Sequence, residues 1–156
     1  METKLRTGRE TDLPEVLRLN GKLADLHAEK DDYFRPGSET RKAVKDWLGS
    51  VFEDENALVL VVEKDEGLGG YFVGVIEETK PFIRPDREGR ISDAYLEPEL
   101  RGEGLAGLAF ERFREWFKTN DIDSIRLSVH SENEDAINAW RSLGFEEYMK
   151  RMKTEI

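Results

Sequence analysis

Cysteine is absent from this 156-residue chain, and only two histidines are present. Without thiols the chain forms no disulfides and performs no thiolate chemistry, and two isolated histidines argue against a zinc site. No apolar run approaches the roughly 20 residues of a membrane-spanning helix, and the start METKLRTGRETD lacks a signal-peptide core. We therefore expect a cytoplasmic protein that holds no metal and has no membrane partner.

Positive charge is also scarce, because 24 Lys and Arg stand against 34 Asp and Glu, which gives a net charge of -10. Affinity for nucleic-acid phosphates comes from clustered Lys and Arg, so nucleic acid is not an expected partner. An acidic surface suits a cationic substrate. The plainer alternative is that the surplus carboxylates only keep the surface solvated.

Internal repeats, low-complexity tracts and Pro/Ser-rich linkers are absent as well, so we expect one domain over residues 1–156. Helical and alternating apolar patterns, with the turn DEGLGG between two β-rich runs, predict ten elements in the order β-α-α-β-β-β-α-β-α-β. They lie at 5–10, 13–26, 38–52, 57–64, 69–78, 89–97, 105–120, 124–130, 133–145 and 146–155. This order predicts a mixed α/β fold of the α+β kind, with three α/β/α layers, a mostly antiparallel sheet and one βαβ crossover.

The stretch RGEGLAG, residues 101–107, satisfies several phosphate-binding patterns at once. A dinucleotide-binding fold places its G-x-G-x-x-G in an early βαβ unit, whereas only about fifty residues follow this one. A P-loop requires Lys and Ser/Thr after the last glycine, where Leu108 and Ala109 stand. What remains is a turn that presents backbone N–H groups at a helix N-terminus.

Two glycines make such a turn accessible to a phosphate. Gly102 and Gly104 carry no side chains, so an anion can approach their amides, and the dipole of the following helix favours negative charge. Arg101 adds a cation beside them. A tight turn whose glycines serve only the backbone conformation is the alternative.

Residues 91–145 resemble the GNAT superfamily of acyl-CoA-dependent N-acetyltransferases. The run LEPELRGEGLA is similar to the V-x-P strand exit of that family and to its R/Q-x-x-G-x-G/A pyrophosphate loop. The run NEDAINAWRSLGF is similar to its N-x-x-A helix that closes on Gly-Phe. The first ninety residues carry little of this motif information.

This resemblance implies acetyl-coenzyme A as cosubstrate. In the family, the strands that correspond to 89–97 and 124–130 splay apart in a twisted sheet, and the pantetheine arm fills the gap. A backbone N–H there polarises the thioester carbonyl. The resemblance assigns Asn133 to orienting the arm, although a plain helix N-cap explains this residue equally well. The implied cofactor-binding residues are Tyr95, Leu96, Arg101, Gly102, Glu103, Gly104, Leu105, Ala106 and Asn133.

The resemblance also implies transfer of the acetyl group to a primary amine by direct attack in a ternary complex. The amine has to lose a proton, and Asp93 on the strand before the glycine turn is the first candidate base or amine-binding group. Strict alternation along this strand would place Ile91 and Tyr95 on the same face as Asp93. The alternative interpretation is that Asp93 is only a solvated carboxylate. The acceptor, a small cationic amine or a peptide N-terminus, is expected to lie between Tyr33 and Phe34, unless those aromatics only stabilise an exposed loop.

His27 and His130 show no evident partners in the sequence and are expected to be structural.

Trp140 departs from the family pattern. Seven residues after Asn133 many members carry a tyrosine that protonates the departing thiolate, whereas an indole N–H cannot deliver a proton. Tyr95, Tyr148 and Ser142 are the alternative proton donors, and Trp140 as core filling is the plainer interpretation. Two alternative functions therefore stay open, a non-catalytic acyl-CoA sensor and a pure interaction module. A homodimer is compatible with all of these functions.

Overall fold

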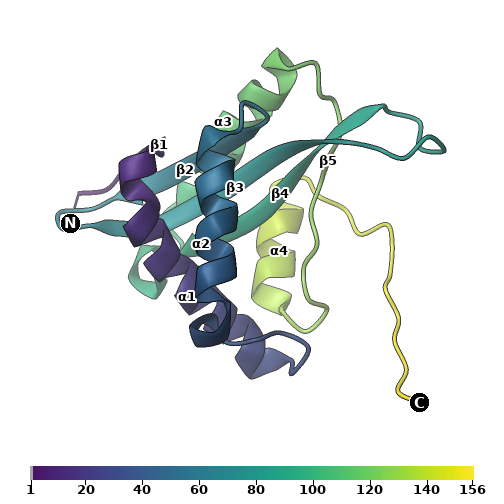
Figure 1. Cartoon of the computed structure of the whole chain (residues 1–156). Coiled ribbons are helices and arrows are strands. Elements are labelled where there is room, and N and C mark those ends of the chain that lie inside the picture. Colours follow the sequence, from purple (N-terminus) through teal and green to yellow (C-terminus); the bar gives the residue numbers. More distant parts are fainter. Residues whose placement is uncertain (1) are drawn as a thin grey trace.

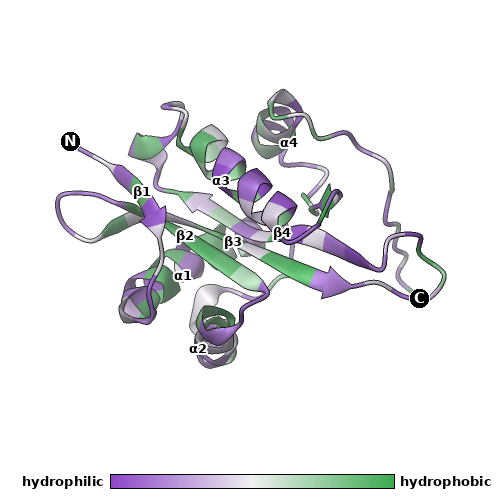
Figure 2. Ribbon diagram, turned by 90° about the horizontal axis from the view of Figure 1, so that it is seen from above, coloured by the Kyte–Doolittle hydropathy of each residue, from purple (hydrophilic) through white to green (hydrophobic). Residues whose placement is uncertain are grey.

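The protein is described by a computed structural model that covers residues 2–156. Its helices α1 and α2 lie side by side on one face of the sheet in Figure 1, and α3 and α4 lie on the other, as the view from above in Figure 2 shows. In chain order the elements are β1 (Lys4–Thr7), η1 (Glu10–Asp12), α1 (Leu13–Lys30), α2 (Gly37–Glu53), β2 (Ala57–Glu63), β3 (Leu68–Glu78), β4 (Arg87–Leu96), η2 (Pro98–Leu100), α3 (Leu105–Thr119), β5 (Ile125–Arg126) and α4 (Glu134–Ser142).

The five strands form one sheet in sequence order, β1-β2-β3-β4-β5. The first three pairings are antiparallel, and β4 pairs with β5 in parallel after the α3 crossover. The predicted hairpin is present as β2 and β3, which pair from Ala57 with Val75 to Glu63 with Leu68. The mixed α/β fold in three layers is therefore confirmed.

Two apolar cores lie on the two faces of the sheet. The core under α1 and α2 is built around Val16, Leu48 and Tyr71, and the core under α3 around Phe72, Phe113 and Phe117. Figure 2 shows the matching pattern, with green hydrophobic residues turned toward the sheet and purple residues outward. Among the helices of residues 2–156, none combines the length and the apolar character needed to cross a membrane.

The predicted strand over 146–155 is wrong, since β5 is the last strand within residues 2–156 and this segment is an extended, exposed tail. Its apolar residues Tyr148, Met149 and Met152 are 63%, 73% and 95% exposed. They do not alternate, so neither face of a strand would be apolar, and nothing would be buried by pairing it.

A β-bulge in β4 decides which side chains face which layer. Val73 of β3 pairs with Asp93 and Gly74 pairs with Ile91, so Ser92 is the extra residue. The prediction that Ile91 shares the face of Asp93 is therefore wrong. Ile91 belongs to the core under α3, whereas Tyr95 belongs to the core under α1, the face to which Asp93 also points.

Candidate functional site

The outer edge of β4 is paired over a short distance only. Its registers with β5 are Gly89 with Ile125 and Arg90 with Arg126, and the two segments then separate. Within residues 2–156, the edge of β4 from Ile91 to Leu96 that faces away from β3 therefore has no partner strand. Its backbone groups can bond an extended ligand lying along the strand.

The glycine turn opens toward the outside at the end of β4. Gly102 and Gly104 have φ of +81° and +83°, the left-handed region that only glycine enters without strain. A Cβ added to either would meet no atom of the described structure within 4 Å, so the space in front of the turn is open. The glycines therefore serve the backbone conformation, and the turn remains accessible.

The N-terminus of α3 follows directly. Leu108 is the first residue of this helix whose N–H bonds back, to the oxygen of Gly104 at 3.1 Å. In the described part of the chain, no side chain caps the amides before it. Buried Leu105 fixes this first turn to the core, while Ala106 is half-buried. The free amides and the helix dipole together form a site that suits a diphosphate.

Arg101 lies back on the end of β4. Its Nε donates to the oxygen of Leu96 at 2.9 Å, and its guanidinium is 5.7 Å from the ring centre of buried Tyr95. The exposed carboxylate of Glu103 stands next to it in the turn. The side chain of Glu103 would repel a phosphate, so this residue can contribute to anion binding only through its backbone N–H.

Buried Glu97 ties the exit of β4 to its surroundings. Its carboxylate lies 2.9 Å from Lys64, 3.6 Å from Arg18 and 3.8 Å from Lys22, and its N–H donates to the oxygen of Gly69 at 2.8 Å. Burial alone would raise the pKa of Glu97, but the hydrogen bond from Lys64 and the nearby ammonium charges outweigh it and lower this pKa to about 2. The cluster holds the strand exit against α1.

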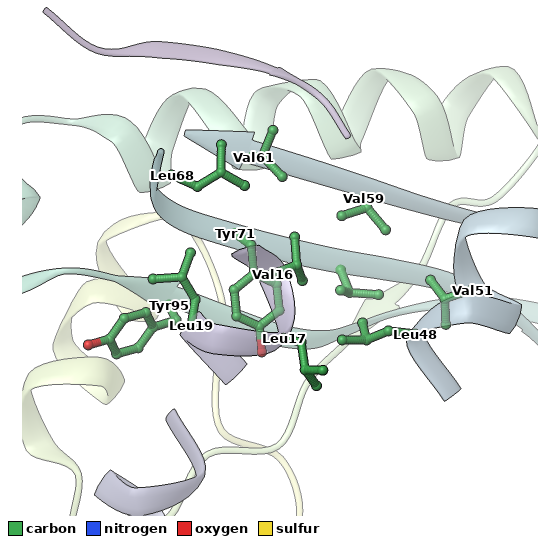
Figure 3. Packing of buried hydrophobic residues seen from close by; sticks show 11 residues of the cluster. Val16, Leu17, Leu19, Leu48, Val51, Val59, Val61, Leu68, Tyr71 and Tyr95 are labelled. Carbon is green, nitrogen blue, oxygen red and sulfur yellow. The ribbon is translucent and has the colours of Figure 1, made fainter. Parts of the chain in front are cut away.

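Asp93 is held by two donors on the α1 face of the sheet. The hydroxyl of Tyr71 donates to Asp93 Oδ2 at 2.6 Å, and Asn20 Nδ2 lies 3.3 Å from the same oxygen and 3.0 Å from the Tyr71 hydroxyl. Burial, followed by the charge of Asp93, raises the pKa of Tyr71, so it stays protonated as a donor. Figure 3 shows Tyr71 and Tyr95 among the buried residues of this face.

His27 lies on α1 two turns after Asn20, half-buried. Its ring centre is 5.2 Å from that of Phe34, which in turn meets Tyr33 edge-on at 5.2 Å. Burial lowers the pKa of His27, so its imidazole is neutral near pH 7. Of the two aromatics predicted to flank an amine, Phe34 thus packs against α1, whereas Tyr33 is 71% exposed beside an open hollow of about 550 Å³ at the C-terminal end of α1.

His130 connects the loop between β5 and α4 with the loop that follows α1. Its Nε2 lies 2.9 Å from Asp31 Oδ2, and its Nδ1 accepts from the N–H of Glu132 at 3.1 Å. Because Nδ1 accepts, the neutral ring carries its proton on Nε2 and donates it to Asp31. Asn133 accepts from the N–H of Ala136 at 3.2 Å, so its N-cap role is present in the structure.

Trp140 lies on the other face of β4. It meets Phe145 edge-on at 5.3 Å, and Phe145 contacts Phe110 at 5.0 Å between ring centres. The indole is half-buried and forms one wall of a narrow apolar crevice that also includes Ile91 and Ala106. The crevice therefore connects the bulge in β4 with the glycine turn.

The sequence interpretation missed Tyr71, Asn20 and Ser92. The sequence held a weak signal for the first two, because Asn20 interrupts the apolar stripe of α1 and Tyr71 is the hydroxyl-bearing residue in the apolar part of β3. The bulge at Ser92 had none. Conversely, the structure brings the predicted residues of the turn and of β4 together at one strand edge, with Asp93 and Trp140 on opposite sides of it.

The order of elements, the free edge of β4 and the open turn before α3 agree with a known protein family. The model of the Acetyltransferase (GNAT) family matches residues 23–145. The chain belongs to this family. The family resemblance noted in the sequence is confirmed.

Three known proteins are similar to this chain in sequence or in fold. Mycothiol acetyltransferase of Rhodococcus jostii (strain RHA1) is 25% identical over 88% of this chain, which spans only 43% of the length of that relative. A tetramutant of the BH1408 protein from Bacillus halodurans has 25% identity and a TM-score of 0.86, over 98% of this chain and 99% of that one. A predicted acetyltransferase from Clostridium acetobutylicum, solved with acetyl-CoA, has 15% identity and a TM-score of 0.75, over 99% and 96%.

Proposed function

We propose that this chain is an N-acetyltransferase that moves the acetyl group of acetyl-coenzyme A to a primary amine by direct attack in a ternary complex. The observation that carries the proposal is the free edge of β4, which runs from the bulge at Ser92 to the open glycine turn and has Asp93 beside it. A cosubstrate with a diphosphate at one end and an extended arm matches this arrangement, and the solved Clostridium structure was obtained with acetyl-CoA.

The residues assigned to the cosubstrate act through their backbone. The amides of the turn at 101–106 would hold the diphosphate at the N-terminus of α3, and backbone groups near Tyr95 and Leu96 would bond the pantetheine arm. Acetyl-coenzyme A supplies an activated acyl thioester. A β4 N–H aimed at the thioester carbonyl would stabilise the oxyanion that forms during attack.

Asp93 is proposed to bind the acceptor amine and to take its proton. Both observed hydrogen bonds to Asp93 fall on Oδ2, which leaves Oδ1 for the amine. The nitrogen forms a bond to the carbonyl carbon, the C–S bond breaks, the amine gives up a proton, and the thiolate takes one. Trp140 cannot supply that last proton. Tyr95 packs in the core under α1, Tyr148 is 63% exposed, and Ser142 Oγ donates to the oxygen of Ala139 at 2.6 Å, so we assign the proton to solvent.

The acceptor is proposed to enter from the side of the α1–α2 loop, where Phe34 and His27 pack together and Tyr33 stays exposed. The hollow at this end of α1 is lined by the carboxylates of Glu29, Asp31, Asp32 and Glu155 and by the ammonium groups of Lys30 and Lys153. The excess of carboxylates favours a cationic amine over a neutral or anionic acceptor.

A titration with acetyl-coenzyme A followed by a thiol-release screen tests the function. The screen covers polyamines, amino acids, aminoglycosides and N-terminal peptides, and we expect saturable binding and release of thiol that depends on the amine. Binding without amine-dependent release would show the acyl-CoA sensor instead. Failure to bind at all would leave an interaction module with a structural glycine turn.

The Asp93→Asn variant is the first prediction for this site. An amide keeps the size of the side chain but cannot accept a proton, so we expect turnover with the acceptor amine to fall by roughly 10²-fold or more. Calorimetry should show an unchanged affinity for acetyl-coenzyme A, because Asp93 faces the acceptor side. Turnover close to wild type would remove Asp93 from the proposal.

A further inference from the structure

The bulge at Ser92 gives the free edge of β4 two chemically different sides. Asp93 points to the α1 side, where the hydroxyl of Tyr71 and the side-chain amide of Asn20 contact it. Ile91, two residues earlier, points to the α3 side and is 5% exposed. A group bound at this edge therefore has a hydrogen-bonding surface on one side and a purely hydrocarbon surface on the other.

The hydrocarbon side is a crevice between β4, α3 and α4. Its lining is wholly apolar, with Phe72, Ile91, Ala106, Phe110, Phe113 and Trp140, and it is too narrow to hold a water molecule. Ala106 belongs to the first turn of α3 and Ile91 adjoins the bulge, so the crevice runs along the stretch proposed for the cosubstrate arm.

Trp140 is the wall of the crevice that α4 contributes. Its indole is fixed edge-on against Phe145, which packs on Phe110, so the ring is braced from behind and cannot withdraw without disturbing this aromatic group. Every other lining side chain comes from β3, β4 or α3. The width of the crevice on the α4 side is thus set by one residue.

We propose that Trp140 is a specificity-determining residue that limits the transferred acyl group to a short chain. This inference rests on the proposed function. An acyl chain placed on the Asp93 side would cover a carboxylate with hydrocarbon, which is costly, whereas the side of Ile91 is already dry. The acyl chain is therefore directed toward the crevice, which the indole keeps closed, so the methyl of an acetyl group fits against its mouth and a longer chain would have to enter it.

Binding of non-reactive ketone analogues tests the proposal apart from turnover. In these analogues of acetyl-CoA and butyryl-CoA, a methylene group separates the sulfur from the carbonyl. We expect wild type to bind the acetyl analogue at least about tenfold more tightly by calorimetry, since hydrophobic pockets discriminate by roughly 10- to 200-fold per methylene. In Trp140→Ala the preference should invert by about threefold or more, because each buried methylene favours binding by roughly fourfold.

Two further variants keep the test interpretable. Trp140→Phe retains an aromatic wall and should keep the preference for the acetyl analogue. Trp140→Leu keeps apolar packing if Trp140→Ala fails to fold, and it should also admit the butyryl analogue. The same order is expected for kcat/KM with acetyl-, propionyl- and butyryl-CoA.

The outcomes separate this inference from the function on which it rests. If wild type binds neither analogue nor coenzyme A, the proposed function fails and this inference with it. If wild type binds both analogues equally, or if the alanine and leucine variants keep the acetyl preference, Trp140 does not set chain length and only this inference is overturned.

Discussion

Gly104→Ala is the sharpest test of the glycine turn, because the chain supplies a matched control in Gly144→Ala. Both glycines have left-handed φ, +83° and +100°, and an added Cβ at either would meet no atom of the described structure within 4 Å. The two substitutions therefore carry similar backbone strain of about 1–2 kcal/mol. For a chain of this length that corresponds to a fall in Tm of roughly 2–4 °C per kcal/mol.

The two variants should differ in their response to ligand. Acetyl-coenzyme A at 100 times its Kd stabilises the native state by about 2.7 kcal/mol, so wild-type Tm should rise by several degrees. We expect the same rise in Gly144→Ala and a much smaller one in Gly104→Ala, because the methyl group stands between the turn amides and the diphosphate. Thermal melts with and without ligand measure this directly. Equal ligand-induced shifts in both variants would refute the assignment of the turn to the diphosphate.

Two further predictions concern the polar groups that support β4. The lowered pKa of Glu97, about 2 against 4.5 for the ordinary group, means that its ion pairs stabilise the fold above about pH 4.5 and are lost as the pH falls toward 2. Glu97→Gln should therefore unfold more easily than wild type at pH 7, by on the order of 2–3 kcal/mol in denaturant melts, and the difference should vanish near pH 2; a constant difference would contradict this. Tyr71→Phe removes the hydroxyl that holds Asp93 Oδ2, so kcat/KM for the acceptor amine should fall while acetyl-coenzyme A affinity stays unchanged. An unchanged kcat/KM would give Tyr71 a purely packing role.

The parts of the fold that the sequence predicted well are those with a local physical signal. The apolar stripe of α3, the hairpin of β2 and β3 and the paired glycines at 102 and 104 each follow from periodicity or from the conformational freedom of glycine. The tail at 146–155 failed for the opposite reason. Its Tyr and Met residues stand among Glu and Lys, which are depleted in strands, so no face of it is apolar and pairing would bury nothing.

The candidate site was predictable in its backbone part and not in its side-chain part. The turn at 101–107 is contiguous in the sequence, so its spacing was visible. The partners of Asp93 come from α1 and β3, and His130 meets Asp31 across 99 residues, so only the packed fold brings them together. The segment 124–130 alternates like a strand, yet β5 ends at Arg126, because the edge of β4 has moved away by then.

A single inserted residue explains why the two sides of the site differ. Without the bulge at Ser92, alternation would put Ile91 and Asp93 on one face, and a carboxylate that has to stay ionised would share its surroundings with the hydrocarbon of the α3 core. The insertion instead sends Asp93 toward Tyr71 and Asn20 and Ile91 toward Trp140. In the proposed function, the amine and the acyl group are thus handled on opposite sides of one strand edge. That separation lets the crevice remain dry while the proton-accepting group keeps its hydrogen bonds.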